Sequence, residues 1–431
     1  MIGKRTEDLD ISSLEAFVPR GLISQNLASK VTLDGLSPIR ITWHQDRITK
    51  LEAIDIPNRS SLKLLLPRFV EPHAHIDKAF TWQNFPNLEG SYEGALKANL
   101  QEHLTRSVMQ VRLSAERCLQ LALKNGLRAI RSHVDSFGPF ADQTWEVLVD
   151  LQNEWKQLIQ LQFVAMVPLD YWSTKNGKTF ARKVACHQGL LGGVLTPPFC
   201  KRETRDHLYK LFNLANDFGC GVDLHIDESH ISPGAGLRQL INVLDQIDLK
   251  VPLTCSHLSS MSLLGKRSLV ECADRLAHHE VNVVAMPLTN SWLLGDKELS
   301  PPLERPLAPI GHLQNAGVNV AIGGDNVQDP WFPGGNFDPL SLMAFSLPIA
   351  QLAPWNRLGL SPFTTSASRV MGMDWDGTFS LGSPADFIYL EAKNWSEVLA
   401  SPPKRNVIIK GKHLHEKSFD LNQSTFKNYL K

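Results

Sequence analysis

Two histidines, His73 and His75, are separated by a single residue at the end of an apolar stretch that contains Phe69 and Val70. If this stretch is an extended strand, residues two apart point to the same side, and both imidazoles face one cavity. Neutral imidazole nitrogens held on a rigid strand are suitable ligands for a divalent metal such as zinc or iron. The His-x-His pattern also recurs by chance, so alone it fits two surface or core histidines equally well.

Titratable side chains also follow four apolar, strand-like segments farther along the chain. They occur in these runs: Arg131-Ser132-His133-Val134-Asp135, His225-Ile226-Asp227-Glu228, Cys255-Ser256-His257 and Gly323-Gly324-Asp325. In a parallel barrel the carboxyl ends of the strands meet at one face, where active sites lie. The sequence therefore predicts that these side chains converge with the two histidines.

The simplest chemical interpretation is a single metal centre. Its imidazole ligands are His73, His75 and His225, and Asp325 is a carboxylate that both binds the metal and accepts a proton from its water. A metal lowers the pKa of bound water enough to supply a hydroxide nucleophile near neutral pH.

Two further residues are expected to act beside the metal. Glu228 follows His225 by three residues and can shuttle protons as general acid and base without occupying the metal. His257 would polarise or orient the group under attack; the alternative is a buried histidine bonded to a backbone carbonyl.

Eight strand-like segments alternate with helical patterns over roughly 300 residues, which predicts an α/β chain with a (β/α)8 TIM-like barrel. The segments are Leu66 to Val70, Leu127 to Ser132, Leu161 to Val167, Leu191 to Leu195, Val222 to Ile226, Leu253 to Ser256, Val281 to Met286 and Val318 to Ile322.

The two ends of the chain are expected to form a small β-sandwich domain together. Residues 39–43 and 48–51 read as a hairpin that is too short to fold alone. Residues 385–390 and 406–410 are strand-like and could pair with it. The expected division is 1–66 for the N-terminal part of the sandwich, 67–375 for the hydrolase barrel and 376–431 for its C-terminal part.

The composition of the 431 residues is that of an ordinary soluble enzyme, with 43% hydrophobic and 20% charged residues. The net charge is zero, so no strongly basic face for nucleic acid is expected. Six cysteines without a Cys-x-x-Cys favour a reducing cytoplasm over a disulfide framework. Neither a signal peptide nor a membrane-spanning run is expected.

In this order the motifs resemble the amidohydrolase superfamily, and within it the cytosine deaminase-like group. The resemblance covers most of the chain. It rests on the runs at strand ends given above and on two more: Asp325-Asn326-Val327-Gln328-Asp329-Pro330-Trp331 and Gly382-Ser383-Pro384-Ala385-Asp386-Phe387-Ile388.

The resemblance implies the same ligand set, with Glu228 as proton shuttle and His257 in contact with the reacting ring. Trp331 is similar to an aromatic residue that closes over a planar base; the alternative is a core tryptophan beneath a loop. Similar barrels often bridge a second metal with a carboxylated lysine on strand four. This chain reads Val194-Leu195-Thr196-Pro197 there, so we expect one metal ion, zinc or iron.

Two departures from the cytosine deaminase pattern concern the substrate. Those enzymes have a glutamine after strand three that pairs with the amide edge of the pyrimidine, whereas this chain has Leu169 in the run Met166-Val167-Pro168-Leu169-Asp170. They also have a second aspartate after the strand-eight ligand, where this chain has Asn326. At Leu169 a substrate amide would lose its partner, and at Asn326 an amide can donate where a carboxylate only accepts. Both changes are therefore expected to alter specificity but not the metal chemistry.

The sequence thus predicts a metal-dependent hydrolase that deaminates a planar, amino-substituted nitrogen heterocycle, a small molecule. An enzyme that cleaves a cyclic or linear amide at the same site is the alternative, and an inactive metal-binding module is a third. Relatives in this group often oligomerise, so a homo-oligomer is compatible with the resemblance.

Overall fold

The computed structural model describes residues 11–24, 27, 30–55, 62–295 and 304–414. Its centre is an eight-stranded parallel sheet in the order β12-β11-β10-β9-β8-β7-β6-β5. The strands are β5 (Phe69–Ala74), β6 (Leu127–Asp135), β7 (Gln160–Met166), β8 (Leu190–Leu195), β9 (Val222–Ile226), β10 (Leu253–His257), β11 (Asn282–Ala285) and β12 (Val320–Ile322). Each of the eight predicted segments thus supplies residues to one barrel strand.

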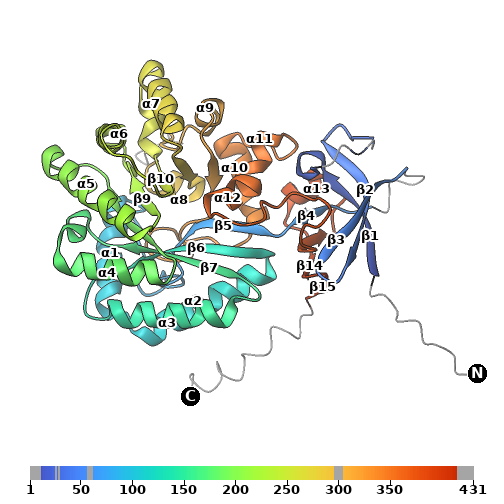
Figure 1. Cartoon of the computed structure of the whole chain (residues 1–431), viewed down its shortest axis with the longest axis horizontal. Helices are drawn as coiled ribbons and strands as arrows, with labels where there is room; N and C mark the ends of the chain where they lie inside the picture. The colour runs from blue at the N-terminus through green and yellow to red at the C-terminus, as the bar shows by residue number, and fades with distance from the viewer. Residues whose placement is uncertain (1–10, 25–26, 28–29, 56–61, 296–303, 415–431) are drawn as a thin grey trace, which may run out of the picture.

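Helices alternate with these strands and wrap around the sheet (Figure 1). The larger ones are α1 (Tyr92–Thr105), α2 (Val108–Lys124), α3 (Ala141–Trp155), α4 (Lys175–Cys186), α5 (Lys201–Phe218), α6 (Ala235–Leu244), α7 (Lys266–His278) and α10 (Pro339–Ala350). Shorter ones are α8 (Pro287–Leu293), α9 (Ile310–Asn315), α11 (Arg357–Leu360), α12 (Thr365–Val370) and α13 (Trp395–Ala400). Strands β5, β6 and β10 are buried along their whole length, as expected where both faces of a parallel sheet are covered.

The sheet closes into a barrel where β5 meets the end of β12. Ala74 and Asp325 form a parallel bridge, and the backbone N–H of Asp325 donates to the carbonyl of His73 at 2.9 Å. Helix α12 packs against both strands at this closure. The first and last barrel strands therefore bring together residues that lie some 250 positions apart in the sequence.

The predicted strand Leu66 to Val70 is wrong in one respect, because it spans two sheets. Leu66 pairs with Ile388 in an antiparallel sheet, whereas Phe69 begins the barrel strand and pairs with Leu127. Arg68 lies between them, where its Nη1 donates to Asp386 at 3.2 Å. A single apolar run can continue through such a crossing because both sheets bury it.

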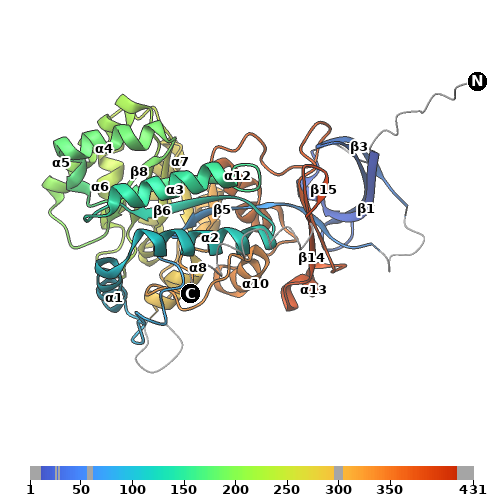
Figure 2. The ribbon, with the colours of Figure 1, turned by 90° about the horizontal axis from the view of Figure 1, so that it is seen from below.

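The chain ends form two small antiparallel sheets, at the end of the molecule away from most helices (Figures 1 and 2). The C-terminal strands were expected to pair with the N-terminal hairpin, but they pair with the residues just before the barrel instead. The first contains β1 (Ile11–Pro19), β2 (Leu36–His44) and β3 (Arg47–Ala53), which confirms the predicted hairpin. The second contains β4 (Leu65–Pro67), β13 (Phe387–Leu390), β14 (Arg405–Ile409) and β15 (Lys412–His413). Strand β1 was not predicted.

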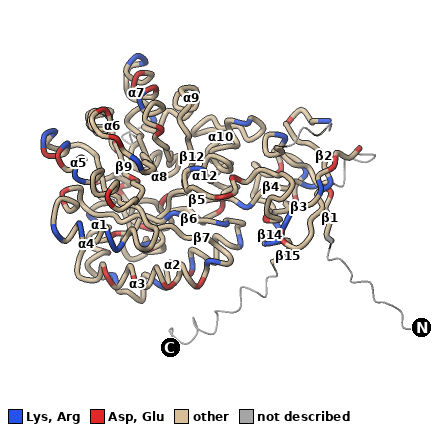
Figure 3. Tube along the Cα trace, in the orientation of Figure 1, with Lys and Arg blue, Asp and Glu red and all other residues tan. Residues whose placement is uncertain are grey.

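Charges of both signs alternate along the chain, over the helices and the sheets alike (Figure 3). Within the described ranges, no helix combines the length and the apolar character that crossing a bilayer requires.

Candidate metal centre and active site

Four of the predicted site residues come together at the carboxyl ends of the barrel strands. His73 and His75 lie at the end of β5, His225 on β9 and Asp325 just after β12. Asp325 Oδ1 is 3.3 Å from Nε2 of His75 and 3.5 Å from Nε2 of His73. The ring centroids of His73 and His225 are 4.8 Å apart. Each of these residues is at most 6% exposed.

Several polar atoms of this cluster are buried without hydrogen-bond partners. Within the described part of the chain this holds for Nε2 of His73, Nδ1 of His225 and both carboxylate oxygens of Asp325. Buried polar atoms are normally paired, since leaving them unpaired costs free energy. A cation at the centre would satisfy them together. His73, His75 and Asp325 each offer one atom within 4.8 Å of the others, as metal ligation requires.

The electrostatics also fit a cation. Burial lowers the pKa of His75 and His225, so both rings are held neutral, the form that ligates metals. Burial raises the pKa of Asp325, but the adjacent rings of His73 and His75, whose Nε2 atoms lie 3.5 and 3.3 Å from Oδ1, outweigh this and hold the pKa well below its usual range. The carboxylate is therefore charged, and three neutral imidazoles with one carboxylate suit zinc or iron.

A chain of buried hydrogen bonds holds the ring of His73 from behind. Its Nδ1 is 2.9 Å from the hydroxyl of Ser256, which donates to Asp223 Oδ1 at 2.8 Å. Arg131 donates from Nη1 to the other oxygen of Asp223 at 2.8 Å. Since the Ser256 hydroxyl donates onward, it accepts from His73, which places the proton on Nδ1 and leaves Nε2 free for a metal.

The ring of His75 is oriented in the same way by the backbone, because its Nδ1 lies 3.1 Å from the carbonyl oxygen of His133. The side chain of His133 stacks on His73 with centroids 3.8 Å apart. Burial lowers the pKa of His133 well below its usual range. His73, His133 and Asp223 form another group with metal-ligand spacing, but Asp223 already accepts hydrogen bonds from Ser256 and Arg131.

Glu71 fixes the closure of the barrel beside the cluster. Its carboxylate accepts from the backbone N–H of His73 at 3.1 Å and from that of Gly324 at 3.0 Å. Burial raises its pKa to about 8. Glu71 was not predicted as a site residue; its position two residues before His73, on the same strand face, was the available signal.

Glu228 and His257 lie next to each other, beside the predicted metal centre. Nδ1 of His257 is 3.3 Å from Glu228 Oε1, and Asn290 on α8 bridges them through its Nδ2, at 3.0 Å and 3.2 Å. Burial, and secondly the charge of Asp325, raise the pKa of Glu228 well above its usual range. Burial lowers the pKa of His257 to about 3. A carboxylate with a raised pKa accepts a proton more readily than an ordinary one, which suits proton transfer.

The backbone turns sharply where these side chains leave the strands. Asp227, His257 and Asp325 have φ values of 52°, 72° and 63°, in the left-handed region that side-chain-bearing residues rarely occupy. The first turn is fixed by Asp227 itself, whose carboxylate accepts from the backbone N–H groups of Gly236 and Leu237 at 2.8 and 2.9 Å. Strained backbone of this kind is often found at functional sites.

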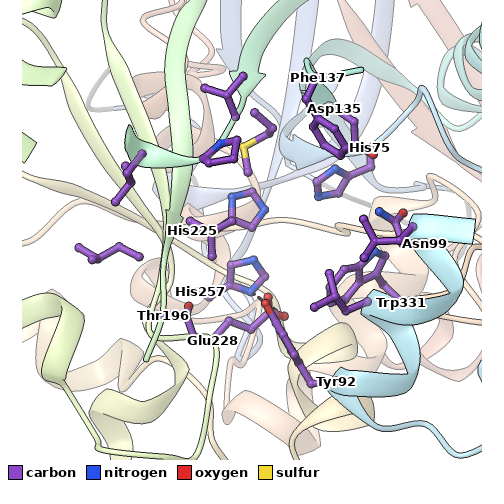
Figure 4. A pocket seen from close by; sticks show the side chains of 18 of the residues that line it. His75, Tyr92, Asn99, Asp135, Phe137, Thr196, His225, Glu228, His257 and Trp331 are labelled. Carbon is purple, nitrogen blue, oxygen red and sulfur yellow. Dashed lines mark ion pairs between the residues drawn. The ribbon is translucent and has the colours of Figure 1, made fainter. Parts of the chain in front are cut away.

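A cavity of about 630 Å³ opens above the centre (Figure 4). The three residues predicted to bind substrate, Leu169, Asn326 and Trp331, all line it. Leu169 lies in the short helix η2 (Leu169–Ser173). Trp331 packs edge to face against Tyr92, with centroids 5.1 Å apart. Nδ2 of Asn326 donates one of its two N–H groups to Asp329 at 2.7 Å, which leaves the other for a ligand.

One wall of the cavity was missed by the sequence argument. Helix α1 contributes Tyr92, Leu96, Asn99 and Leu100, which are spaced so that they share one helix face. This face carries no charge and no metal-ligand pattern. Only its helical period could have indicated that it faces a common surface.

Below this wall, a buried network of charges joins α1 to β5 and β6. Arg106, which caps α1, donates to Asp77 and to Asp135 at 3.0 Å each, and also pairs with Glu102. Nζ of Lys78 donates a hydrogen bond to Asp135 Oδ1 at 3.1 Å. Lys78 and Asp135 line the cavity as well.

Comparison with known proteins finds one family model and several similar enzymes. A family model described as "Amidohydrolase family" matches residues 90–415. A pterin deaminase from Rhizobium rhizogenes is 29% identical over 81% of this chain and 80% of its own. An N-isopropylammelide isopropyl amidohydrolase from a Pseudomonas species is 24% identical over 85% of this chain and 90% of its own. The structure of 5-methylcytosine deaminase from Klebsiella pneumoniae, at 21% identity, aligns with a TM-score of 0.79 over 94% of this chain and 98% of its own.

Proposed function

The chain belongs to the amidohydrolase family, and from this membership we propose that it removes an amino or substituted amino group from a planar nitrogen heterocycle. The observation that carries the proposal is the buried, unpartnered cluster of ligand atoms on His73, His225 and Asp325, facing Glu228 at the floor of a cavity. The related pterin deaminase and 5-methylcytosine deaminase act on such rings by name, which supports the substrate class.

The metal would be held by His73, His75, His225 and Asp325. We propose a single zinc or iron ion, since β8 ends at Leu195 and is followed by Thr196 where a bridging lysine would be needed. When bound, the ion supplies Lewis-acid activation of water. The neighbouring side chains then move the protons and orient the ring.

Glu228 is the proposed proton shuttle. It takes a proton from the attacking water and delivers it to the leaving nitrogen, so that ammonia or an amine departs. Burial raises its pKa well above the usual range, which favours uptake of a proton from the water.

His257 is the proposed donor to the ring. Asn290 Nδ2 donates to Nδ1 of His257, and the low pKa keeps the ring neutral, so its single proton is on Nε2. That atom is buried, and no described residue pairs with it. A positioned N–H donor can stabilise the negative charge that develops on the ring as water attacks.

The cavity is larger than a bare six-membered ring requires. At about 630 Å³ it lies within the range of roughly 300 to 1,000 Å³ typical of sites for drug-sized ligands. Leu96, Leu100 and Leu169 give much of its lining an apolar character. We therefore favour a bicyclic ring, or a monocyclic ring that carries an apolar substituent.

The test is ammonia or amine release from a panel of rings by protein loaded separately with zinc, iron or manganese. The panel contains aminopyrimidines, aminotriazines, isoguanine, creatinine-like rings and pterin, and protein stripped of metal is the control. We expect release from at least one ring, with the ring intact in the product. A new carboxylate would indicate amide hydrolysis instead, and silence with stoichiometric metal bound would contradict the proposal.

A reducing cytoplasm is the compartment we propose, because all six cysteines are free thiols.

A further inference from the structure

Asn99 is a buried amide in the α1 wall whose carbonyl oxygen has nothing to bind. The residue is 5% exposed and lines the cavity, and Oδ1 has no hydrogen-bond partner within the described part of the protein. Figure 4 shows it between His75 and Trp331, on the side of the cavity opposite His225 and His257. Leaving such an oxygen unpaired costs free energy, which a ligand in the cavity would recover.

We propose that Asn99 binds the lactam edge of the substrate, in which a ring carbonyl stands next to a ring N–H. A carboxamide is complementary to this edge, because its oxygen accepts from the N–H while its NH₂ group donates to the carbonyl. The proposal rests on the proposed function, since it takes the substrate to be an amino-substituted nitrogen heterocycle. It adds which edge of that ring the protein recognises and names Asn99 as the residue that recognises it.

The rest of the lining offers less to such an edge. On the η2 side, Val167, Pro168 and Leu169 present apolar side chains, and Asp170 offers a carboxyl group but no amide. Asn326 is the other carboxamide in the described lining, and one of its two N–H groups is already donated to Asp329 at 2.7 Å. Asn99 is therefore the carboxamide of the described lining whose oxygen is buried without a partner.

Helix α1 holds Asn99 in a fixed position. At its N-terminus the hydroxyl of Ser91 accepts from the backbone N–H of Gly94 at 3.0 Å. At its C-terminus Arg106 is fixed by the buried carboxylates of Glu102 and Asp77. A recognition group on an element anchored at both ends loses little freedom when it binds, which favours affinity and selectivity.

The test measures binding rather than turnover. Zinc-loaded protein with Glu228→Gln is titrated calorimetrically with cytosine, isocytosine, ammelide and pterin, and with 1-methylcytosine and 3-methylpterin, in which the lactam N–H is blocked. Asn99→Leu removes both halves of the amide, and Asn99→Asp keeps an accepting oxygen but loses the donor. Gln101→Leu removes the same type of group from an exposed position on the same helix and is the matched control.

We expect Asn99→Leu to raise Kd about tenfold or more for the ring that binds best, and to change Kd for its methylated form much less. Asn99→Asp should also weaken binding of that ring, and Gln101→Leu should not. Equal loss for both forms of the ring, no loss in Asn99→Leu, or no binding of any lactam ring would overturn the proposal. If Asn99→Leu shows the expected loss but the parent releases no ammonia, the proposed function fails while the role of Asn99 stands.

Discussion

The two sides of the cavity are built differently. On the metal side, His73 and His225 lie on barrel strands and Asp325 follows one; all three are almost fully buried, and the ring of His73 is held by a hydrogen bond to Ser256. On the α1 side, Leu96 and Leu100 are 43% and 46% exposed. A substitution in the strands disturbs the barrel, whereas one on α1 changes mainly what the cavity accepts. We therefore propose that residues on the metal side carry out the reaction and residues on the α1 side select the substrate, and variants on each side can test this separation.

The largest effect is expected from Glu228→Gln on the metal side. An amide of the same shape cannot shuttle protons, so kcat should fall by about 10²- to 10⁴-fold. Metal content, measured by elemental analysis, should be unchanged, since Glu228 is not among the proposed ligands. Glu203→Gln, at an exposed position in the first turn of α5, is the control and should retain full activity. Full activity in Glu228→Gln would remove the shuttle from the mechanism.

The charge network under the α1 wall should affect stability instead. Arg106→Met leaves the carboxylates of Asp77, Glu102 and Asp135 buried with Lys78 as the nearby cation, which should lower the free energy of unfolding by about 3 to 5 kcal/mol. Urea denaturation measures it. Arg40→Met breaks an ion pair with Glu15 between two exposed side chains and should cost less than about 1 kcal/mol. Similar losses in both variants would contradict the buried role of Arg106.

The hydrogen-bond chain behind His73 should influence metal affinity more than folding. Ser256→Ala removes the acceptor of the His73 Nδ1 proton and should weaken metal binding about tenfold, measured by competition with a chelator. Ser268→Ala, an exposed serine on α7, is the control. Unchanged affinity in Ser256→Ala would mean that the strand alone orients His73.

The sequence predicted the metal side of the cavity better than the α1 side. His73, His75, His225 and Asp325 could be placed together because each follows an apolar strand, and parallel strands end at one face. The partnership of Ser256 with Asp223 depends on the register between β9 and β10, which no local pattern specifies. Asn99 was missed for a related reason, since a polar residue on a helix is expected to face solvent until its neighbours are known. The roles of the site residues and the division into 1–66, 67–375 and 376–431 stay predictions.

The smallest effect is expected on the α1 side, and it is an effect on preference alone. Leu100→Asn places a polar group against any apolar substituent of the substrate, so the ratio of kcat/KM for an N-alkylated ring to that for the bare ring should fall about tenfold. Leu104→Asn changes the same helix face one turn farther from the metal, at a leucine that does not line the main cavity, and should leave the ratio unchanged. Metal content and kcat for the bare ring should stay at the parent values in both variants. A fall in kcat for every substrate in Leu100→Asn would show that the α1 wall also takes part in the reaction, and the two sides of the cavity would not be separable.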